Sequence, residues 1–383
     1  MKLVRVGDYI TEQTQRNKAS EDIPVYSVTN TQGFCQDYFN KEVASKDKST
    51  YKIVKKGWFA YNPSRINVGS IDWLKNNIAI VSPLYNVFSL SSEMDPDYLL
   101  YYLKSSVGLS LINATATGSV RNNLKFSMLA NFYIPLPDLK MQKSIVSILK
   151  RIQSLIDTKR KQINLLDELV KARFVELFGD PIENPMEWPT RSLMSMGKCK
   201  NGMNFHNSDS GIEINCLGVG DFKDYSVIVD TSLLPTVSLN EMPSDDYLLQ
   251  DEDIVFVRSN GNKKMVGRSI IAYPGNTPTT FSGFCIRFRN EDKTISVPYL
   301  LSVLKTDGMR KQMYGRGANI QNLNQQILAS LQIPVPPLEL QQQYVSFVAQ
   351  IDKSKFVESL HLAKCKNRQY NKIGFLEVNT WDM

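Results

Sequence analysis

Four loops rich in Arg, Asn and Gln carry the residue types best suited to recognising nucleic acid. They span residues 65–69, 115–123, 258–268 and 314–324. Arg, Asn and Gln side chains can read base edges through paired donors and acceptors, and glycines let the backbone approach phosphates. For any one loop, a solvated surface loop is the open alternative, but the loops recur at equivalent places in both halves and acids are locally absent. We therefore expect DNA contacts from Arg65, Asn67, Thr117, Ser119, Arg121, Asn122, Arg258, Asn260, Asn262, Lys263, Arg268, Arg316, Asn319, Gln321 and Asn322.

The charge of the chain is unevenly placed. The formal net charge of +7 divides into +3 for residues 1–139, +5 for 140–179, −2 for 180–337 and +2 for 338–378, with −1 at the end. Residues 254–290 hold six cations and no acid, whereas residues 209–253 hold eleven acids and one cation. This polarity is typical of a protein that offers one face to an anion.

Signatures of catalysis are missing from the sequence. It contains neither Gly-x4-Gly-Lys-Ser/Thr, which would cradle ATP phosphates, nor Asn/Asp-Pro-Pro-Tyr, which an adenine methylase would need. The Gly-x-Gly at 218–220 is more simply a strand-end turn. Two histidines, His206 and His361, and five scattered cysteines make general-base catalysis or a zinc site improbable. We expect no catalytic residue, no metal site and reduced cysteines.

One enzymatic alternative remains open. Pro137-Asp138 followed by Asp157-Thr158-Lys159 imitates the paired carboxylates of a metal-dependent nuclease. Such carboxylates normally lie on neighbouring strands, and Asp157 is expected inside a helix. A stand-alone Mg²⁺-dependent endonuclease is therefore the weaker hypothesis, and a cleavage assay would test it.

A duplicated segment organises the chain. Ile-Pro-Leu-Pro-Asp-Leu at 134–139 and Ile-Pro-Val-Pro-Pro-Leu at 333–338 are offset by 199 residues, as are Gln142 and Gln341. Proline fixes φ and keeps the preceding residue out of the α region. Each Ile-Pro-x-Pro is therefore predicted to be an extended strap, with a helix beginning after it.

Heptad spacing predicts that the two helices pair. In the first helix apolar residues alternate in steps of four and three, which keeps one seam facing a partner. The second helix is less regular and has Lys355 in its seam. Two independent surface helices are the open alternative. We assign the coiled-coil seam to Ile145, Leu149, Ile152, Ile156, Ile163, Leu166, Val170, Leu177, Val348, Ile351 and Leu360.

The globular segments before each helix repeat one plan. Short β-like runs at 23–28, 57–61, 78–81 and 85–90 precede a predicted helix over 96–111, and residues 253–257 correspond to 57–61. Strand and helix signals mix without βαβ regularity, which favours an α+β fold. We predict globular domains at 1–139 and 180–337 and long helices at 140–179 and 338–378.

No apolar run approaches the roughly 18 residues that a membrane span needs. The first eight residues break too soon for a signal peptide. A cytoplasmic location is expected.

The duplicated straps, each running through Leu-x-x-Gln into a long helix, resemble the specificity subunit of type I restriction–modification enzymes. The resemblance extends to Gly57…Val68-Gly69 in the first half and Asp253-Ile254-Val255…Val266-Gly267 in the second. It covers residues 1–378. Lys355 and Asn367 depart from an ideal coiled coil.

This resemblance implies two DNA-recognition domains that each read half of a split, asymmetric site, separated by an antiparallel coiled coil. It also implies double-stranded DNA, two methyltransferase subunits and restriction subunits as partners. S-adenosylmethionine, ATP and Mg²⁺ would be bound by those partners, and no cofactor by this chain. The sequence does not specify the bases recognised.

Overall fold

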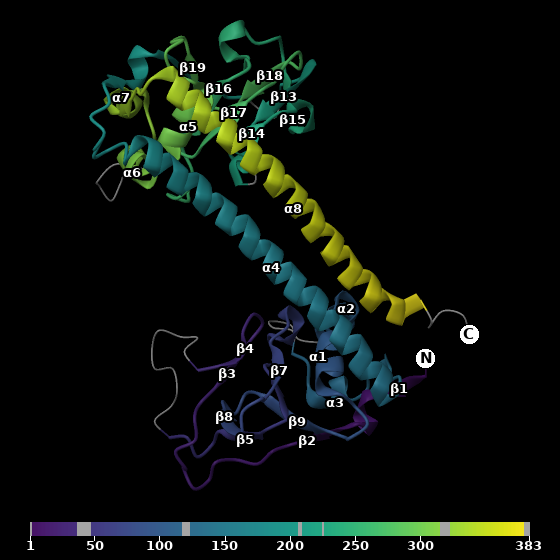
Figure 1. Cartoon of the computed structure of the whole chain (residues 1–383). Coiled ribbons are helices and arrows are strands. Elements are labelled where there is room, and N and C mark those ends of the chain that lie inside the picture. Colours follow the sequence, from purple (N-terminus) through teal and green to yellow (C-terminus); the bar gives the residue numbers. More distant parts are fainter. Residues whose placement is uncertain are drawn as a thin grey trace. The chain divides into compact units, whose positions relative to one another are not determined.

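The computed structural model describes residues 2–36, 47–116, 123–205, 209–223, 226–314 and 322–378, and the side chains of these except for Lys223 and 366–378. The chain divides into two compact units, Met1–Gln162 with Val357–Met383, and Ile163–Phe356. The long helices α4 (Leu139–Phe178) and α8 (Leu338–Val378) contribute to both units (Figure 1). The segment before α4 is called domain 1, and the segment between α4 and α8 domain 2.

Domain 1 is built on an antiparallel four-stranded sheet in the order β2-β9-β6-β7. Short pairs β3-β4, β5-β8 and β1-β10 surround it, and helices α1 to α3 cover its core. The elements are β1 (Leu3–Arg5), β2 (Ile10–Glu12), β3 (Ser27–Thr29), β4 (Gly33–Cys35), β5 (Lys52–Lys55), β6 (Phe59–Tyr61), β7 (Ile71–Trp73), β8 (Ile78–Val81), β9 (Asn86–Leu90), α1 (Pro96–Lys104), α2 (Ser106–Thr115), α3 (Phe126–Leu129) and β10 (Tyr133–Pro135).

Domain 2 repeats this arrangement with a five-stranded sheet in the order β12-β19-β16-β17-β14 and a further sheet β15-β13-β18. Its elements are β11 (Thr190–Ser192), β12 (Gly197–Asn201), β13 (Ile212–Leu217), β14 (Val227–Ile228), β15 (Thr236–Leu239), β16 (Asp253–Val257), β17 (Ser269–Ala272), β18 (Thr279–Phe281), β19 (Cys285–Asn290), α5 (Val297–Lys305), α6 (Asp307–Met313), α7 (Gln325–Ser330) and β20 (Gln332–Pro334). The mixed strand and helix content confirms the predicted α+β class, with two similar globular domains and two long helices.

The helix predicted over 96–111 is wrong in one respect, because it breaks at Ser105. That residue has extended backbone angles (φ −70°, ψ 165°), and its hydroxyl accepts a hydrogen bond from the Gly108 amide at 3.1 Å. It therefore ends α1 and caps α2. Thr306 separates α5 from α6 with a similar extended backbone (φ −60°, ψ 148°), but its side chain does not cap α6.

Each Ile-Pro strap is a short strand that leads directly into a long helix. Ile134 of β10 pairs with Val4 of β1, and Ile333 of β20 pairs with Arg191 of β11. Both isoleucines are fully buried. The prolines thus lie in isolated two-stranded pairs, where a missing backbone donor is tolerated.

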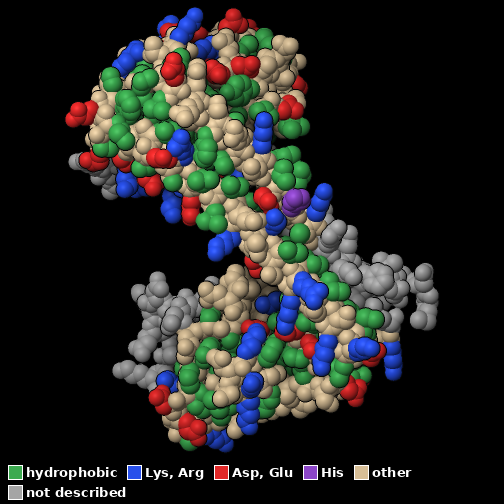
Figure 2. All heavy atoms as spheres, viewed as in Figure 1, with side chains coloured by type: hydrophobic (Ala, Val, Ile, Leu, Met, Phe, Trp, Pro, Cys, Tyr) green, Lys and Arg blue, Asp and Glu red, His purple; other side chains and the backbone are tan. Residues whose placement is uncertain are grey.

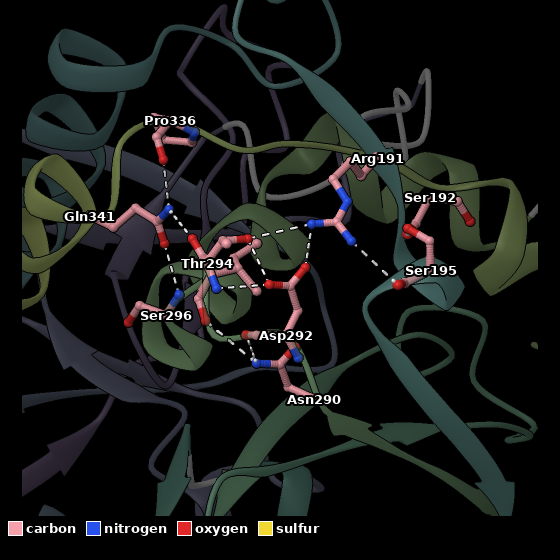
Figure 3. Close-up of polar contacts among 10 residues, drawn as sticks. Arg191, Ser192, Ser195, Asn290, Asp292, Thr294, Ser296, Pro336 and Gln341 are labelled. Atoms are coloured by element: carbon pink, nitrogen blue, oxygen red, sulfur yellow. Dashed lines mark hydrogen bonds and ion pairs between the residues drawn. The ribbon is translucent and has the colours of Figure 1, made fainter.

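A buried glutamine fixes the start of each long helix to its domain. The Gln341 side chain donates to the carbonyls of Pro336 (2.7 Å) and Thr294 (3.1 Å) and accepts from the Ser296 amide at 2.8 Å (Figure 3). Gln142 makes the equivalent bonds, donating to Pro137 and Glu93 and accepting from the Asp95 amide. Neither glutamine is exposed to solvent. In each domain the glutamine therefore joins the strap, the start of the long helix and a turn by hydrogen bonds. That turn precedes α1 in domain 1 and α5 in domain 2.

The turn held by Gln341 is itself braced by an ion pair. Arg191 contacts the carboxylate of Asp292, which also accepts hydrogen bonds from the amide and hydroxyl of Thr294, both at 2.7 Å (Figure 3). The bonds from Thr294, with a smaller contribution from Arg191, hold the pKa of Asp292 below its ordinary value. The carboxylate therefore remains charged and keeps the turn in place.

Aromatic packing anchors both long helices to domain 2. Phe174 and Phe178 near the end of α4 lie with their ring centroids 5.6 and 5.5 Å from that of Tyr344 in α8. Phe178 also lies 4.8 Å from Tyr299 of α5. All four side chains are buried. Rings of this size remove much apolar surface from water, and edge-to-face pairs add to that stabilisation.

The two helices run antiparallel within each unit. Lys159 pairs with Glu358 at 2.8 Å in one unit, and Asp167 pairs with Lys355 at 2.7 Å in the other. Leu149, Ile156 and Ile351 are buried, while Leu360 is 47% exposed. The remaining predicted seam residues are half-buried: Ile145, Ile152, Ile163, Leu166, Val170, Leu177 and Val348. Ile351 is therefore the last buried apolar residue of the predicted seam on α8, and the assignment of Leu360 to the seam is wrong because its side chain is exposed.

Within the described ranges, no helix is long and apolar enough to cross a membrane.

Candidate nucleic-acid interface

Domain 1 has a polar cleft of about 620 Å³ beside two of the predicted reading loops. The turn after β6, the start of β9 and the segment leading into α3 form its walls. Its lining residues are Glu12, Asn62, Pro63, Ser64, Arg65, Leu84, Asn86, Asn123, Lys125, Phe126 and Ser127.

A buried tyrosine organises the floor of this cleft. The Tyr61 hydroxyl donates to the carbonyl of Leu124 at 3.1 Å and accepts from the Asn86 side-chain amide at 2.9 Å. Burial raises the pKa of Tyr61, so the hydroxyl stays protonated and able to donate. Asn86 is thereby oriented towards the cleft, while its amide carbonyl has no partner among the described residues.

Local turn chemistry shapes the wall opposite Asn86. The side chain of Asn62 accepts from the Ser64 amide at 3.0 Å, and its carbonyl accepts from the Arg65 amide at 3.0 Å. Such Asn-stabilised turns form from local sequence alone. The Leu124 amide then donates to the Pro63 carbonyl at 3.1 Å, which brings Asn123 and Lys125 to the same wall.

The cleft can make the contacts that a nucleic-acid base or phosphate needs. It presents two cations, Arg65 and Lys125, the carboxylate of Glu12, and the amides of Asn86 and Asn123. Neither cation forms an ion pair with the part of the chain that the structure describes. Donors and acceptors of this kind can discriminate base edges, and free cations can contact phosphates.

The structure places some of the residues predicted for domain 1 in this cleft. Arg65 lines it and is exposed, whereas Asn67 is half-buried in the short turn after it and does not line the cleft. The predicted residues Thr117, Ser119, Arg121 and Asn122 lie outside the described residues.

Sequence reasoning missed several lining residues. Asn123 lies within the predicted loop over 115–123 but was not among the residues predicted to contact DNA. Asn62, Ser64 and Lys125 adjoin the predicted loops, so extending each loop by two or three residues would have included them. Asn86 gave no sequence signal, because it reaches the cleft only through the pairing of β9 with β6, where it lies opposite Tyr61.

In domain 2 the loop over 258–268 is held in one conformation by its own side chains. Asn260 accepts from the Asn262 amide at 2.8 Å, and Asn262 accepts from the Lys264 amide at 3.1 Å. Arg268 donates to the carbonyl of Phe222 at 3.0 Å. The loop is therefore preformed and leaves the basic side chain of Lys263 exposed.

The structure brings this loop against the end of the second predicted loop. Ser259 pairs with Asn322 in an isolated bridge, and the Leu323 amide donates to the carbonyl of Arg258 at 2.8 Å. Arg258 and Asn322 thus lie close together. Arg316, Asn319 and Gln321 lie outside the described residues.

The predicted matching of residues 57–61 in domain 1 with 253–257 in domain 2 is wrong by one residue. The Leu124 amide donates to the Pro63 carbonyl, and the Leu323 amide donates in the same way to the Arg258 carbonyl. Pro63 therefore corresponds to Arg258, so residues of β6 and β16 differ in number by 195 rather than the predicted 196. Gly57 (φ 83°) accordingly matches Glu252 (φ 70°) and not Asp253. The loop insertions between the repeats hid this shift in the sequence.

With this correspondence, the floors of the two sites differ. Tyr61 of domain 1 is replaced by Phe256, and Asn86 by Ile286, which lies opposite Phe256 as Asn86 lies opposite Tyr61. The polar floor of the domain 1 cleft thus corresponds to fully buried apolar core in domain 2. Basic and acidic side chains are interspersed over the visible face of domain 2, so no single sign of charge dominates it (Figure 2).

The carboxylates proposed for a nuclease do not form a metal site. Asp138 caps α4 by accepting from the Met141 amide at 2.8 Å, and Asp157 is exposed beside Arg160 at 3.7 Å. Nineteen residues of helix separate them, which is about 28 Å. Among the described residues, no group of three His, Cys, Asp or Glu side chains could hold a metal ion.

Comparison with known proteins gives concordant matches. The family model for the type I restriction modification DNA specificity domain matches residues 4–168 and again 185–360. The StySPI specificity subunit of Salmonella potsdam is 24% identical over 67% of this chain, a match that spans 58% of that protein. The MjaVIII specificity subunit of Methanocaldococcus jannaschii is 26% identical over 95% of this chain and 90% of its own length.

Solved structures share the fold. The S subunit of a type I system from M. genitalium superimposes with a TM-score of 0.55 at 16% identity, covering 98% of this chain and 95% of that one. A chain from a structure of a type I restriction–modification system, solved to explain complex assembly and conformational transition, gives 0.58 at 15% identity, with coverages of 98% and 97%.

Proposed function

This chain belongs to the type I restriction–modification DNA specificity family, and we propose that it reads a bipartite, asymmetric DNA site for a complex that methylates and restricts DNA. The observation that carries the proposal is that the family model matches twice, once in each half. Each half also has its own recognition loops and its own glutamine that locks a long helix. Two readers in one chain suit a site with two different halves.

The different floors of the two sites support the asymmetry of the DNA site. Tyr61 and Asn86 give domain 1 polar groups where Phe256 and Ile286 give domain 2 apolar ones. Phe256 and Ile286 are fully buried in the core, so domain 2 has no counterpart of this polar floor and would read its bases from its loops alone. Two domains built so differently at this point would select different base sequences.

The partners and cofactors follow from this role. Two methyltransferase subunits would assemble on the chain in the cytoplasm, with restriction subunits outside them. S-adenosylmethionine, ATP and Mg²⁺ would bind to those subunits, because this sequence contains no motif for any of them. Native mass spectrometry of the co-expressed subunits measures the stoichiometry.

The chain itself is proposed to be non-catalytic. The purified protein should show no DNA methylation with S-adenosylmethionine and no cleavage with Mg²⁺, because it lacks the motifs and the described residues hold no metal cluster. Mg²⁺-dependent cleavage by the pure chain, abolished by Asp138→Asn or Asp157→Asn, would instead support the nuclease alternative.

Methylation mapping tests the reading function directly. In cells that express the complete system, Arg65→Ala with Asn86→Ala should relax recognition of one half-site only. The loss of a bidentate side chain costs on the order of 1–3 kcal/mol of discrimination. Arg316→Ala with Asn319→Ala should relax the other half, and Thr117→Ala with Arg121→Ala should affect the same half as Arg65. Equal degradation of both halves by either set would contradict modular reading.

A further inference from the structure

Three basic side chains gather at the base of the domain 2 loops. Arg268 ends the loop over 258–268, Lys305 is the last residue of α5, and Arg310 lies in α6. Arg310 donates to the carbonyl of Lys264 at 3.0 Å, and the charges of Arg268 and Arg310 both act on the Lys305 ammonium group. Arg268, Lys305 and Arg310 are called the basic cluster below.

The basic cluster lacks a counter-ion. Arg268 and Arg310 donate to neutral carbonyls, and neither forms an ion pair within the described part of the chain; nor does Lys305. The nearest acid acting on Lys305, Asp352, already lies 3.5 Å from Lys355. Like charges held together without an anion are unfavourable, and a bound anion would relieve their repulsion.

The basic surroundings of Lys305 affect the pKa of its ammonium group. Loss of water from its ammonium group lowers the pKa to about 8, and repulsion from Lys355, Arg268 and Arg310 acts in the same direction against the attraction of Asp352. Lys305 as a whole residue is exposed, so the loss of water from its ammonium group is only partial and an external anion can approach it.

The basic cluster is fixed relative to the loop over 258–268 and to Tyr314, the first residue of the second predicted loop. Arg310 lies over the ring of Tyr314, 5.5 Å from its centroid, immediately before the segment that begins at Gly315. Gly267 packs so closely on α6 that a Cβ there would lie 2.9 Å from the Met313 Cβ. The loop over 258–268 and α6 therefore form one rigid support for the cluster.

Resting on the proposed function, we propose that the basic cluster binds the DNA phosphate backbone beside the bases that domain 2 reads. Phosphate contacts fix the register and orientation of a protein on the duplex, while other residues read the sequence. The cluster adjoins the loop over 258–268, so phosphates bound to it would lie beside the residues of that loop that are predicted to contact DNA.

Domain 1 does not repeat this arrangement. Ser70, Lys104 and Leu109 occupy the equivalent places, as judged from the Gly69–Gly267 turn and the ends of α1 and α5. Only the lysine is retained, and the negative charge of Asp72 acts on it. The inferred phosphate contact is therefore specific to domain 2.

The salt dependence of DNA binding tests the inference. The assembly with its methyltransferase subunits is titrated with a duplex that carries the mapped site, between about 50 and 200 mM KCl. Arg268→Gln, Lys305→Gln and Arg310→Gln should each reduce the slope of log affinity against log salt by about 0.9, without changing the methylated sequence. Lys198→Gln is the matched control, because Lys198 pairs with Glu291 at 2.8 Å.

Measuring DNA affinity over a series of pH values distinguishes the contribution of Lys305 from those of Arg268 and Arg310. Because only its protonated form binds phosphate, wild-type affinity should fall as the pH rises through about 8, the pKa of Lys305. Lys305→Arg, which stays charged, should keep the wild-type salt slope and lose this fall. An unchanged pH profile in Lys305→Arg would contradict the role of Lys305.

Each other outcome is also decisive. Slopes that match the Lys198→Gln control would overturn the inference, and so would an altered methylated sequence, since that would indicate base reading. Loss of the methyltransferase subunits on gel filtration would identify the anion as an acidic protein surface. If the wild-type assembly did not prefer its mapped site to a scrambled duplex, the proposed function would fail instead.

Discussion

Gln142 and Gln341 are the residues on which the attachment of the long helices most depends. Each is fully buried, and each uses its amide donors for two carbonyls and its amide carbonyl for one backbone N–H. A buried polar group of this kind stabilises a fold only when it is fully hydrogen-bonded. Here a single side chain satisfies three backbone groups in two segments distant in sequence.

Replacing Gln142 by Leu should therefore be costly. The change leaves the Asp95 amide and the carbonyls of Glu93 and Pro137 without their partner, and each unsatisfied buried group costs about 1–3 kcal/mol. We expect a loss of about 3 kcal/mol or more in the free energy of unfolding, measured with urea. Gln162→Leu, at an exposed position on the same helix, is the control and should stay within about 0.5 kcal/mol. Similar values for both variants would contradict this account.

At the scale of elements, features with local causes were predictable. Prolines and heptads placed the helices at 140–179 and 338–378, and the structure has them at Leu139–Phe178 and Leu338–Val378. The break at Ser105 was missed because apolar residues continue through it. Asn86 was missed because strand pairing, which the sequence does not display, brings it to Tyr61. Of the residues predicted to contact DNA, the candidate cleft thus includes only Arg65, while its other loop residues lie within a few positions of the predicted ones and Asn86 lies on a sheet.

Lys355, the irregular residue of the α8 seam, is compensated by acids. Burial alone would lower its pKa, but the hydrogen bond from its ammonium to Asp167 and the charges of Asp167 and Asp352 raise it overall. Its side chain is 28% exposed and that of Asp167 51%, so water screens the pair. The seam therefore tolerates a cation without depending on it.

Lys355→Met should accordingly reduce stability only modestly. We expect a loss of up to about 1 kcal/mol at low salt, which shrinks towards zero near about 1 M salt. Urea unfolding at both salt concentrations measures it, with the exposed Lys353→Met as control. Exchange of the pair, Lys355→Asp with Asp167→Lys, should recover part of the loss. A salt-independent loss of several kcal/mol would show that the ammonium group is essential to the seam.

At the scale of the molecule, the chain repeats the contacts that attach its long helices and varies the residues beneath its candidate DNA-contacting loops. The glutamine locks, the Ile-Pro straps and the antiparallel ion pairs recur, while Tyr61 and Asn86 change to Phe256 and Ile286. A repeat that keeps its supports can exchange base-reading residues without losing the attachment of its helices. This separation also explains why the fold could be inferred from the sequence and the recognised bases could not.

The two helices should set the spacing between the half-sites, because α4 starts directly after domain 1 and leads directly into domain 2. Inserting four residues into both helices, near Ile156 and Lys355, adds about 6 Å and a rotation of about 40° beyond one full circle. A base pair of DNA advances about 3.4 Å and turns about 35°. The rotation matches one added base pair and the rise allows two. Methylation mapping should therefore find unchanged half-sites separated by one or two more base pairs. An unchanged spacer, or an altered half-site, would show that the helices do not set this distance.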